Sequence, residues 1–231
     1  MDPTKPYSSF SDALAFATAE INKVDPAYCK NFLLILEFCF KYVKDAGGLH
    51  SSKPKLSQKW IEAKAKQFVD ERYTVKPTTT LNIPDALIGV ISEEYFGVES
   101  VDIDKLLDNH KIAMAAENIT GSLLEEYIAT VMEPLGWIWC SGKMVKASDF
   151  IKFSSVKSVK PHLLQVKNRS NSENSSSSSI RKGTTIDKWH RLEATSGATR
   201  WHKFPDKEGK EMLSEEKFLE FVRDRITKWH G

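Results

Sequence analysis

The chain has 231 residues, of which 41% are hydrophobic and 28% are charged, a composition typical of a globular protein that can bury a sizeable core. No apolar run approaches the about 18 residues that a membrane-spanning helix needs, since the best candidate, residues 32–36, stops at Glu37. The net charge of +2 hides an asymmetry: residues 1–140 hold 14 Lys/Arg against 20 Asp/Glu, and residues 141–231 hold 19 against 11. A basic half beside an acidic half indicates a polyanionic partner on one side of the molecule.

Three scattered cysteines, Cys29, Cys39 and Cys140, form no CxxC pair, so neither a disulfide framework nor a structural zinc site is indicated. The N-terminus has no basic region followed by an apolar run, so we expect no secretory signal. An intracellular, reducing compartment is therefore the expected location.

The first half of the chain is predicted to be helical, because its apolar residues recur near a period of 3.6. None of its residues stands in a spacing that indicates chemistry, and we interpret it as a helical scaffold. The expected helices cover residues 10–46, 55–73, 85–95 and 100–115.

The pattern changes after Asn118. A helix is expected over residues 121–133, where Pro134 stops it. Short strand-like runs follow, then a polar stretch with five consecutive serines, and a final helix. We expect His190 to lie on a surface helix, and contact with DNA is the alternative. The runs are 137–139, 148–151 and 163–167 for the strands, 168–179 for the polar stretch and 214–229 for the helix.

Four polar residues of this second half can meet at one edge of a sheet. Gln165 and Lys167 are two apart on a strand and therefore share a face, whereas Leu164 and Val166 point to the core. If the strands before and after form a hairpin, Asp149 reaches the same edge. On the preceding helix, Glu125 borders an apolar stripe, and Glu126 is expected to point to solvent.

These residue types suit the hydrolysis of a phosphodiester bond. Mg²⁺ is held in proteins by one or two carboxylates together with water and phosphate oxygens, and it supplies a Lewis acid for this chemistry. A lysine beside it can orient or deprotonate water and offset the charge of the phosphate.

The order Asp149, Gln165, Lys167 resembles the PD-(D/E)xK nuclease superfamily, and residues 121–125 followed by Gly136-Trp137 resemble its helix motif. The resemblance implies an α/β fold, a restriction-endonuclease-like core with a mixed central sheet flanked by helices, preceded here by a helical N-terminal half. It implies catalytic roles for Glu125, Asp149, Gln165 and Lys167, with Mg²⁺ held by Asp149, Gln165 and Glu125. Two positions depart from the pattern: Ala147-Ser148 replaces the proline, and Gln165 replaces an acidic residue, which leaves the number of metal ions open.

A narrower resemblance follows the lysine. Residues 167–175 and the serines up to Ser179, then residues 180–184 and Lys188-Trp189, are similar to type II restriction endonucleases of the SinI-like group, which cuts within GGWCC; the resemblance covers residues 117–201. Amides and hydroxyls followed by cations suit phosphates and base edges. The expected DNA-binding residues are Asn168, Arg169, Asn171, Asn174, Ser175, Ser177, Arg181, Lys182 and Lys188.

The resemblance implies one nuclease domain over residues 1–231, with a mainly helical portion at 1–115 and the catalytic core and recognition segment at 116–231. It also implies a homodimer acting on double-stranded DNA in the bacterial or archaeal cytoplasm, away from membranes. No GxxxxGK[ST] loop is present, so no nucleotide cofactor is expected. Two alternatives stay open: a repair, junction or methylated-DNA nuclease of the same fold, and a non-catalytic DNA-binding protein.

Overall fold

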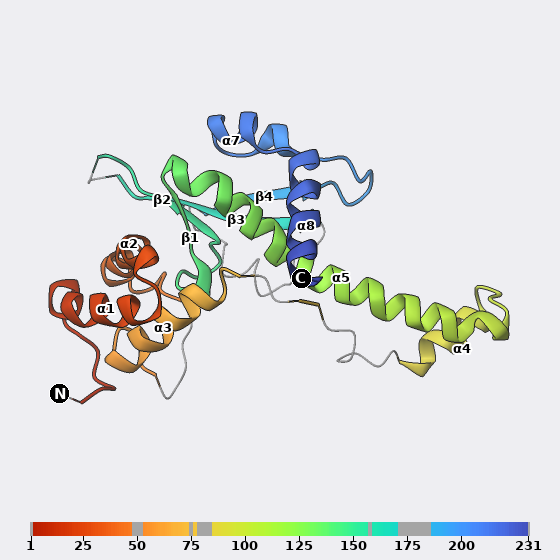
Figure 1. Ribbon diagram of the computed structural model, residues 1–231, viewed down its shortest axis with the longest axis horizontal. Coiled ribbons are helices and arrows are strands. Elements are labelled where there is room, and N and C mark those ends of the chain that lie inside the picture. The colour runs from red at the N-terminus through yellow and green to blue at the C-terminus, as the bar shows by residue number, and fades with distance from the viewer. Residues whose placement is uncertain are drawn as a thin grey trace.

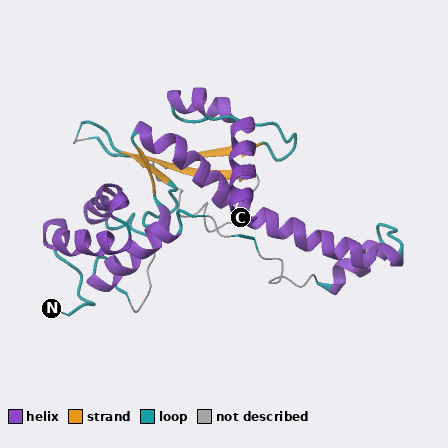
Figure 2. Ribbon diagram, viewed as in Figure 1, coloured by secondary structure: helices purple, strands orange, loops and turns teal. Residues whose placement is uncertain are grey.

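The computed structural model of the chain describes residues 2–47, 53–73, 76–77, 85–156, 159–170 and 186–230. A four-stranded sheet stands between helices of the N-terminal half and helices that follow later in the chain (Figures 1 and 2). This is the expected α/β class, a mixed sheet flanked by helices with a helical N-terminal half. The main elements are α1 (Phe10–Val24), α2 (Cys29–Lys41), α3 (Gln58–Asp70), α4 (Ala86–Glu94), α5 (Ile103–Met132), β1 (Trp137–Trp139), β2 (Phe150–Lys152), β3 (His162–Arg169), β4 (Ile186–Leu192), α7 (Lys207–Met212) and α8 (Glu215–His230).

Residues 10–46, expected to be helical, contain two helices, α1 and α2. Asp25 ends α1 in an extended conformation and caps a short 3-10 turn, Pro26–Tyr28, from which α2 continues. Pro26 has no N–H to offer to a continuous helix, so the chain breaks at this point. Helix α3 begins where the Ser57 side chain accepts a hydrogen bond from the N–H of Trp60.

The two helices expected over residues 100–115 and 121–133 are one helix of 30 residues, α5. Gly121 lies inside it, because a glycine lowers helix propensity by only about 1 kcal/mol and does not remove a hydrogen bond. The expected stop at Pro134 is confirmed, since the chain passes through a 3-10 turn, Glu133–Leu135, to Gly136 at φ 86°. Helices α4 and α8 lie close to their predicted positions, and α7 was not predicted.

The sheet has the order β1-β2-β3-β4, in which β1, β2 and β3 pair antiparallel and β4 pairs parallel to β3. The hairpin partners Phe150 and Leu164 face each other across β2 and β3. Strand β4 was not predicted, and the expectation that His190 lies on a helix is wrong: His190 is the partner of Lys167 in the parallel pair.

Each face of the sheet has its own hydrophobic core because successive side chains alternate. Ile138, Ile151 and Leu163 face the core formed with α1, α2 and α3. The other face packs against the second half of α5 and against α8, with side chains from all four strands: Trp137, Trp139, Phe150, Leu164, Val166 and Trp189.

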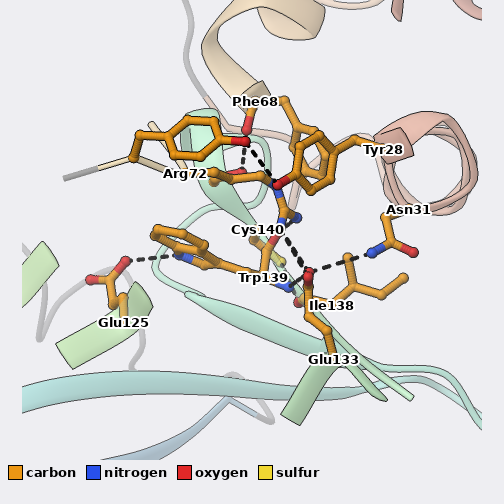
Figure 3. A network of polar contacts seen from close by, with 11 residues as sticks. Tyr28, Asn31, Phe68, Arg72, Glu125, Glu133, Ile138, Trp139 and Cys140 are labelled. Atoms are coloured by element: carbon orange, nitrogen blue, oxygen red, sulfur yellow. Dashed lines mark hydrogen bonds and ion pairs between the residues drawn. The ribbon is translucent and has the colours of Figure 1, made fainter. Parts of the chain in front are cut away.

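Arg72, just after α3, joins the helical half to the sheet (Figure 3). Its Nη1 donates to both carboxylate oxygens of Glu133, at 2.9 and 3.0 Å, and its Nη2 donates to the Trp139 carbonyl at 3.0 Å. The guanidinium also lies 4.3 Å and 4.6 Å from the ring centres of Phe68 and Tyr28, and the Arg72 residue is only 5% exposed. A charge so enclosed depends on its carboxylate partner.

Replacing Glu133 with alanine should therefore destabilise the fold strongly. Removal of one partner from a buried ion pair typically costs about 3–5 kcal/mol, and we expect a loss of this size in the free energy of unfolding, measured with urea. Lys23→Ala is the control, because its pair with Glu20 is exposed at the lysine and such pairs contribute about 0.2–1 kcal/mol. A loss below about 1 kcal/mol for Glu133→Ala would contradict this account of the junction.

Candidate active site

Asp149 directly precedes β2, where backbone hydrogen bonds fix it on both sides. Its N–H donates to the Leu164 carbonyl and its carbonyl accepts from the N–H of Cys140, both at 2.8 Å. Its carboxylate accepts a hydrogen bond from the N–H of Val166, at 2.7 Å. Asp149 is thereby held beside the stretch of β3 that contains Gln165 and Lys167.

Glu125 comes to the same place from the second half of α5. Its Oε2 accepts a hydrogen bond from Nε1 of Trp139, at 3.0 Å, which ties the helix to β1 (Figure 3). Glu125 and Asp149 both line a cavity of about 960 Å³. The hairpin and helix therefore bring together two carboxylates that are separated in sequence.

Gln165 and Lys167 share one face of β3, as their spacing predicted. Lys167 is half-buried, and its positive charge lowers the pKa of both Asp149 and Glu125. Gln165 is 4% exposed, and its Oε1 accepts no hydrogen bond within the described residues. An enclosed oxygen without a donor is suited to a ligand that bears positive charge.

Burial and the mutual repulsion of the two carboxylates destabilise their ionised forms. Burial raises the pKa of Glu125 above its ordinary value, and the negative charge of Asp149 raises it further, against the smaller effects of Trp139 and Lys167. Burial also raises the pKa of Asp149, while the hydrogen bond from Val166 and the charge of Lys167 lower it. A cation placed between the two carboxylates would stabilise their ionised forms.

The donor set fits a hard divalent cation. Within the described residues no three His, Cys, Asp or Glu side chains are grouped as metal ligands, which leaves two carboxylates and the Gln165 amide as the candidate ligands. Mg²⁺ commonly takes one or two carboxylates and keeps several water ligands, so this set is sufficient. The site has two carboxylates and not three because position 165, acidic in the superfamily pattern, holds glutamine.

Glu126 does not point to solvent, so that expectation is wrong. It is 4% exposed and forms an ion pair with Arg225 of α8. Helix α8 covers the side of α5 that a helical wheel of α5 alone leaves open. Glu126 is therefore a contact between helices.

The structure describes three of the nine expected DNA-binding residues. Asn168 points to the α8 side of the sheet, where its Oδ1 accepts a hydrogen bond from Nε of Arg191 at 2.9 Å. Arg169 is exposed at the end of β3, and Lys188 lies on β4 as the partner of Gln165. The other six lie outside the described residues: Asn171, Asn174, Ser175, Ser177, Arg181 and Lys182.

Sequence reasoning missed the loop between β1 and β2, which lines the same cavity. Gly142 has φ 71°, and a Cβ there would lie 2.8 Å from the backbone nitrogen of Phe68. The buried ammonium of Lys64 accordingly sits against the Gly142 carbonyl, and Ser141 Oγ donates to the Phe68 carbonyl at 2.7 Å. Helix α3 thus holds the loop, and the exposed Lys143 and Lys146 line the cavity. The Gly142-Lys143 pair was the one local signal of this loop.

Comparison with known proteins decides the family. The family model of the SinI restriction endonucleases matches residues 13–228. The chain belongs to this family. It is 38% identical over 228 residues to the type II restriction enzyme Eco47I of Escherichia coli, covering 97% of this chain and 99% of the relative. It is 36% identical over 220 residues to the type II restriction enzyme SinI of Salmonella infantis, covering 94% and 95%.

The enzyme is accordingly a type II site-specific deoxyribonuclease that acts on double-stranded DNA. The resemblance found in residues 117–201 thus extends over nearly the whole chain, helical half included. Type II restriction endonucleases generally require a divalent metal, in agreement with the oxygen ligands at the site. Among the described helices, none is both long and apolar enough to cross a bilayer.

The raised carboxyl pKa values predict how stability depends on pH when metal is removed. Because the pKa of Glu125 and of Asp149 is raised by folding, the folded chain keeps protons that the unfolded chain has released. The free energy of unfolding therefore falls as pH rises from the ordinary carboxyl range through the raised values. We expect the melting temperature in chelator to decline over this range, and Glu125→Gln to remove part of the decline.

The matched control is Glu216→Gln, an exposed glutamate on α8, which should leave the pH profile of the melting temperature unchanged. If Glu125→Gln shows the same decline as the unaltered enzyme, the raised pKa of the Glu125 carboxyl is not a cause of the pH dependence.

Proposed function

We propose that this enzyme hydrolyses DNA with Mg²⁺ at Glu125, Asp149, Gln165 and Lys167. The observation that carries the proposal is the position of Asp149: its carboxylate is fixed by the N–H of Val166, the residue between Gln165 and Lys167. That carboxylate also shares its cavity with Glu125. The proposal is supported further by Gln165, whose buried Oε1 has no donor among the described residues, and by Lys167, whose charge lowers the pKa of both carboxyls.

Asp149, Glu125 and the Oε1 of Gln165 would hold the metal ion. When bound, Mg²⁺ supplies a Lewis acid that lowers the pKa of water and neutralises charge on the phosphate. Lys167 orients the attacking water and offsets the charge that develops on the phosphate oxygens. Trp139 keeps Glu125 directed into the cavity through its Nε1–H, and this hydrogen bond holds α5 beside β1 at the site.

We propose that Lys143 and Lys146 bind phosphates of the strand that enters the cavity. Both are exposed, both line the cavity, and their ammonium groups have no hydrogen-bond or ion-pair partner within the described residues. The loop that carries them is fixed on α3, so little conformational entropy is lost when they bind.

Sequence recognition is proposed for residues 168–188, including Arg181 and Lys188, with GGWCC as the candidate site. This segment begins next to Lys167, so DNA whose phosphate reaches that lysine passes close to it. Asparagine and arginine can make paired hydrogen bonds to adenine and guanine in the major groove. GGWCC is palindromic, so both DNA strands carry the sequence GGWCC. Two copies of one protein related by a two-fold axis can bind such a site most simply, and we therefore also propose a homodimer.

We further propose that residues 1–231 act as one nuclease unit. The core formed by α1, α2 and α3 includes Ile138, Ile151 and Leu163 of the sheet, so the helical half and the catalytic strands bury a common surface.

The catalytic proposal is tested with Asp149→Ala and Lys167→Ala. Without the Asp149 carboxylate a metal ligand is lost, and we expect no cleavage of a GGWCC duplex in Mg²⁺, while binding measured by fluorescence anisotropy persists. Lys167→Ala should cleave at least ~10²-fold more slowly, the lower end for a group that positions or transfers a proton. Asp224→Ala, exposed on α8, should cleave normally. Undiminished cutting by Asp149→Ala would remove Asp149 from the site.

The phosphate contacts are tested by the dependence of DNA binding on salt. Each phosphate contact contributes about 1 to the slope of log K against log salt concentration. Lys143→Ala and Lys146→Ala should each reduce that slope by about this amount, on cognate and random duplexes alike. Lys210→Ala, exposed on α7, should not change it. A slope that stays constant in both loop variants would show that the loop does not touch the backbone.

A further inference from the structure

Helix α4 and the first half of α5 extend away from the sheet as an arm (Figure 1). We call residues 85–114 the arm. Within it only Gly89 and Ser92 are buried, whereas the second half of α5 contributes seven buried residues to the molecule, from Leu123 to Met132. The arm therefore lacks a core of its own in the single chain.

The exposed side chains of the arm are nevertheless large and apolar. On α4, Leu87, Val90 and Ile91 follow the i, i+3, i+4 spacing of one helix face, and Gly89 packs α4 against Ile103 of α5. The exposed set, with the exposed fraction of each residue, is Leu87 57%, Val90 54%, Ile91 45%, Tyr95 80%, Phe96 71%, Val101 81% and Ile112 59%.

This arrangement is costly for an isolated chain. Helices shorter than about 12–15 residues are marginal in water, and α4 has 9. Fixing a backbone costs about 1–2 kcal/mol per residue, which burial of apolar surface must offset. Soluble monomers rarely expose apolar patches beyond a few hundred Å². The arm thus requires a surface that covers it.

DNA is not that surface, because its phosphates repel an acidic arm and offer no apolar side chains that would offset the repulsion. The arm contains seven Asp/Glu and two Lys, so it is acidic and is repelled by phosphates. The same charge opposes an anionic lipid surface. A protein surface that accepts apolar side chains is what remains.

We infer that the arm is the dimer interface, with the arms of two copies packed on each other about a two-fold axis. The inference rests on the proposed function: each chain brings one pair of site carboxylates, Glu125 and Asp149, whereas a double-strand cut needs two such sites.

The size of the surface agrees with this partner. At roughly 100 Å² exposed for each of the seven side chains, the arm offers on the order of 700 Å². Each partner in a stable interface contributes about 800 Å². Helix α5 also connects the surface directly to the active site, since Glu125 lies on the same helix, about 33 Å along its axis from Ile103.

The test measures the dimer itself, in chelator and without DNA, by sedimentation equilibrium. We expect the unaltered enzyme to be a dimer, and Val90→Glu with Ile91→Glu to weaken it by at least ~100-fold. Because introduced charges could also disturb α4, Tyr95→Ser with Phe96→Ser is the second variant; both rings are too exposed to serve the fold of a monomer. Val43→Glu, 49% exposed and outside the arm, should remain a dimer.

Salt gives a further readout, because two acidic arms repel each other. Dimerisation should strengthen with rising salt, whereas DNA binding weakens. A monomeric unaltered enzyme, or arm variants that stay dimeric, would overturn the inference. Dimerisation weakened by salt would also overturn it, because the interface would then pair opposite charges.

Activity separates the inference from the proposed function. Arm variants at concentrations where they are monomeric should accumulate nicked plasmid, with one strand cut, whereas Val43→Glu should produce linear plasmid. Arm variants that still cut both strands as monomers would overturn the inference while leaving the catalytic proposal intact. Loss of all cleavage in Asp149→Ala bears only on the catalytic proposal, because the dimer is measured without metal or DNA.

Discussion

The ion pair between Arg72 and Glu133 is the contact on which the placement of β1 and of Glu125 depends. Glu133 accepts the Trp139 N–H at 3.1 Å, and Arg72 donates to the Trp139 carbonyl, so the pair fixes β1 from both sides of one residue (Figure 3). The indole of Trp139 then donates to Glu125. A continuous chain of polar contacts thus leads from the helical half to Glu125 of the candidate site.

The candidate active site combines a charge imbalance with a frame of hydrogen bonds. Two carboxylates are enclosed together, Lys167 offsets their charge only in part, and Gln165 adds an oxygen without adding charge. Such a site is most strained when it is empty of cations and ionised. Backbone hydrogen bonds and the N–H of Val166 hold Asp149 in this enclosed position, where burial raises the pKa of its carboxyl.

Local features were predictable from the sequence and non-local ones were not. That Gln165 and Lys167 share a face followed from the alternation of a strand, which depends on neighbouring residues alone. The position of Asp149 followed only with the added assumption that β2 and β3 form a hairpin, which their antiparallel pairing confirms. Strand β4 was missed because its polar sequence becomes a strand only by pairing parallel to β3, a contact that no local pattern records. The burial of Glu126 depends on Arg225, a residue of α8 about a hundred positions later. The six recognition residues between 171 and 182 remain sequence predictions.

The acidic arm also affects how the enzyme arrives at DNA. Negative charge is in excess in residues 85–114 and positive charge in residues 141–231, a charge distribution with the character of a dipole. Near a polyanion such a dipole experiences a torque that turns the basic part forward before any contact forms. Orientation is normally the slow part of a docking encounter, and charge distribution can raise association rates by 10–10³. The same residues that keep the arm off DNA would therefore align the catalytic face during approach, an effect that fades within a Debye length of about 8 Å at physiological salt.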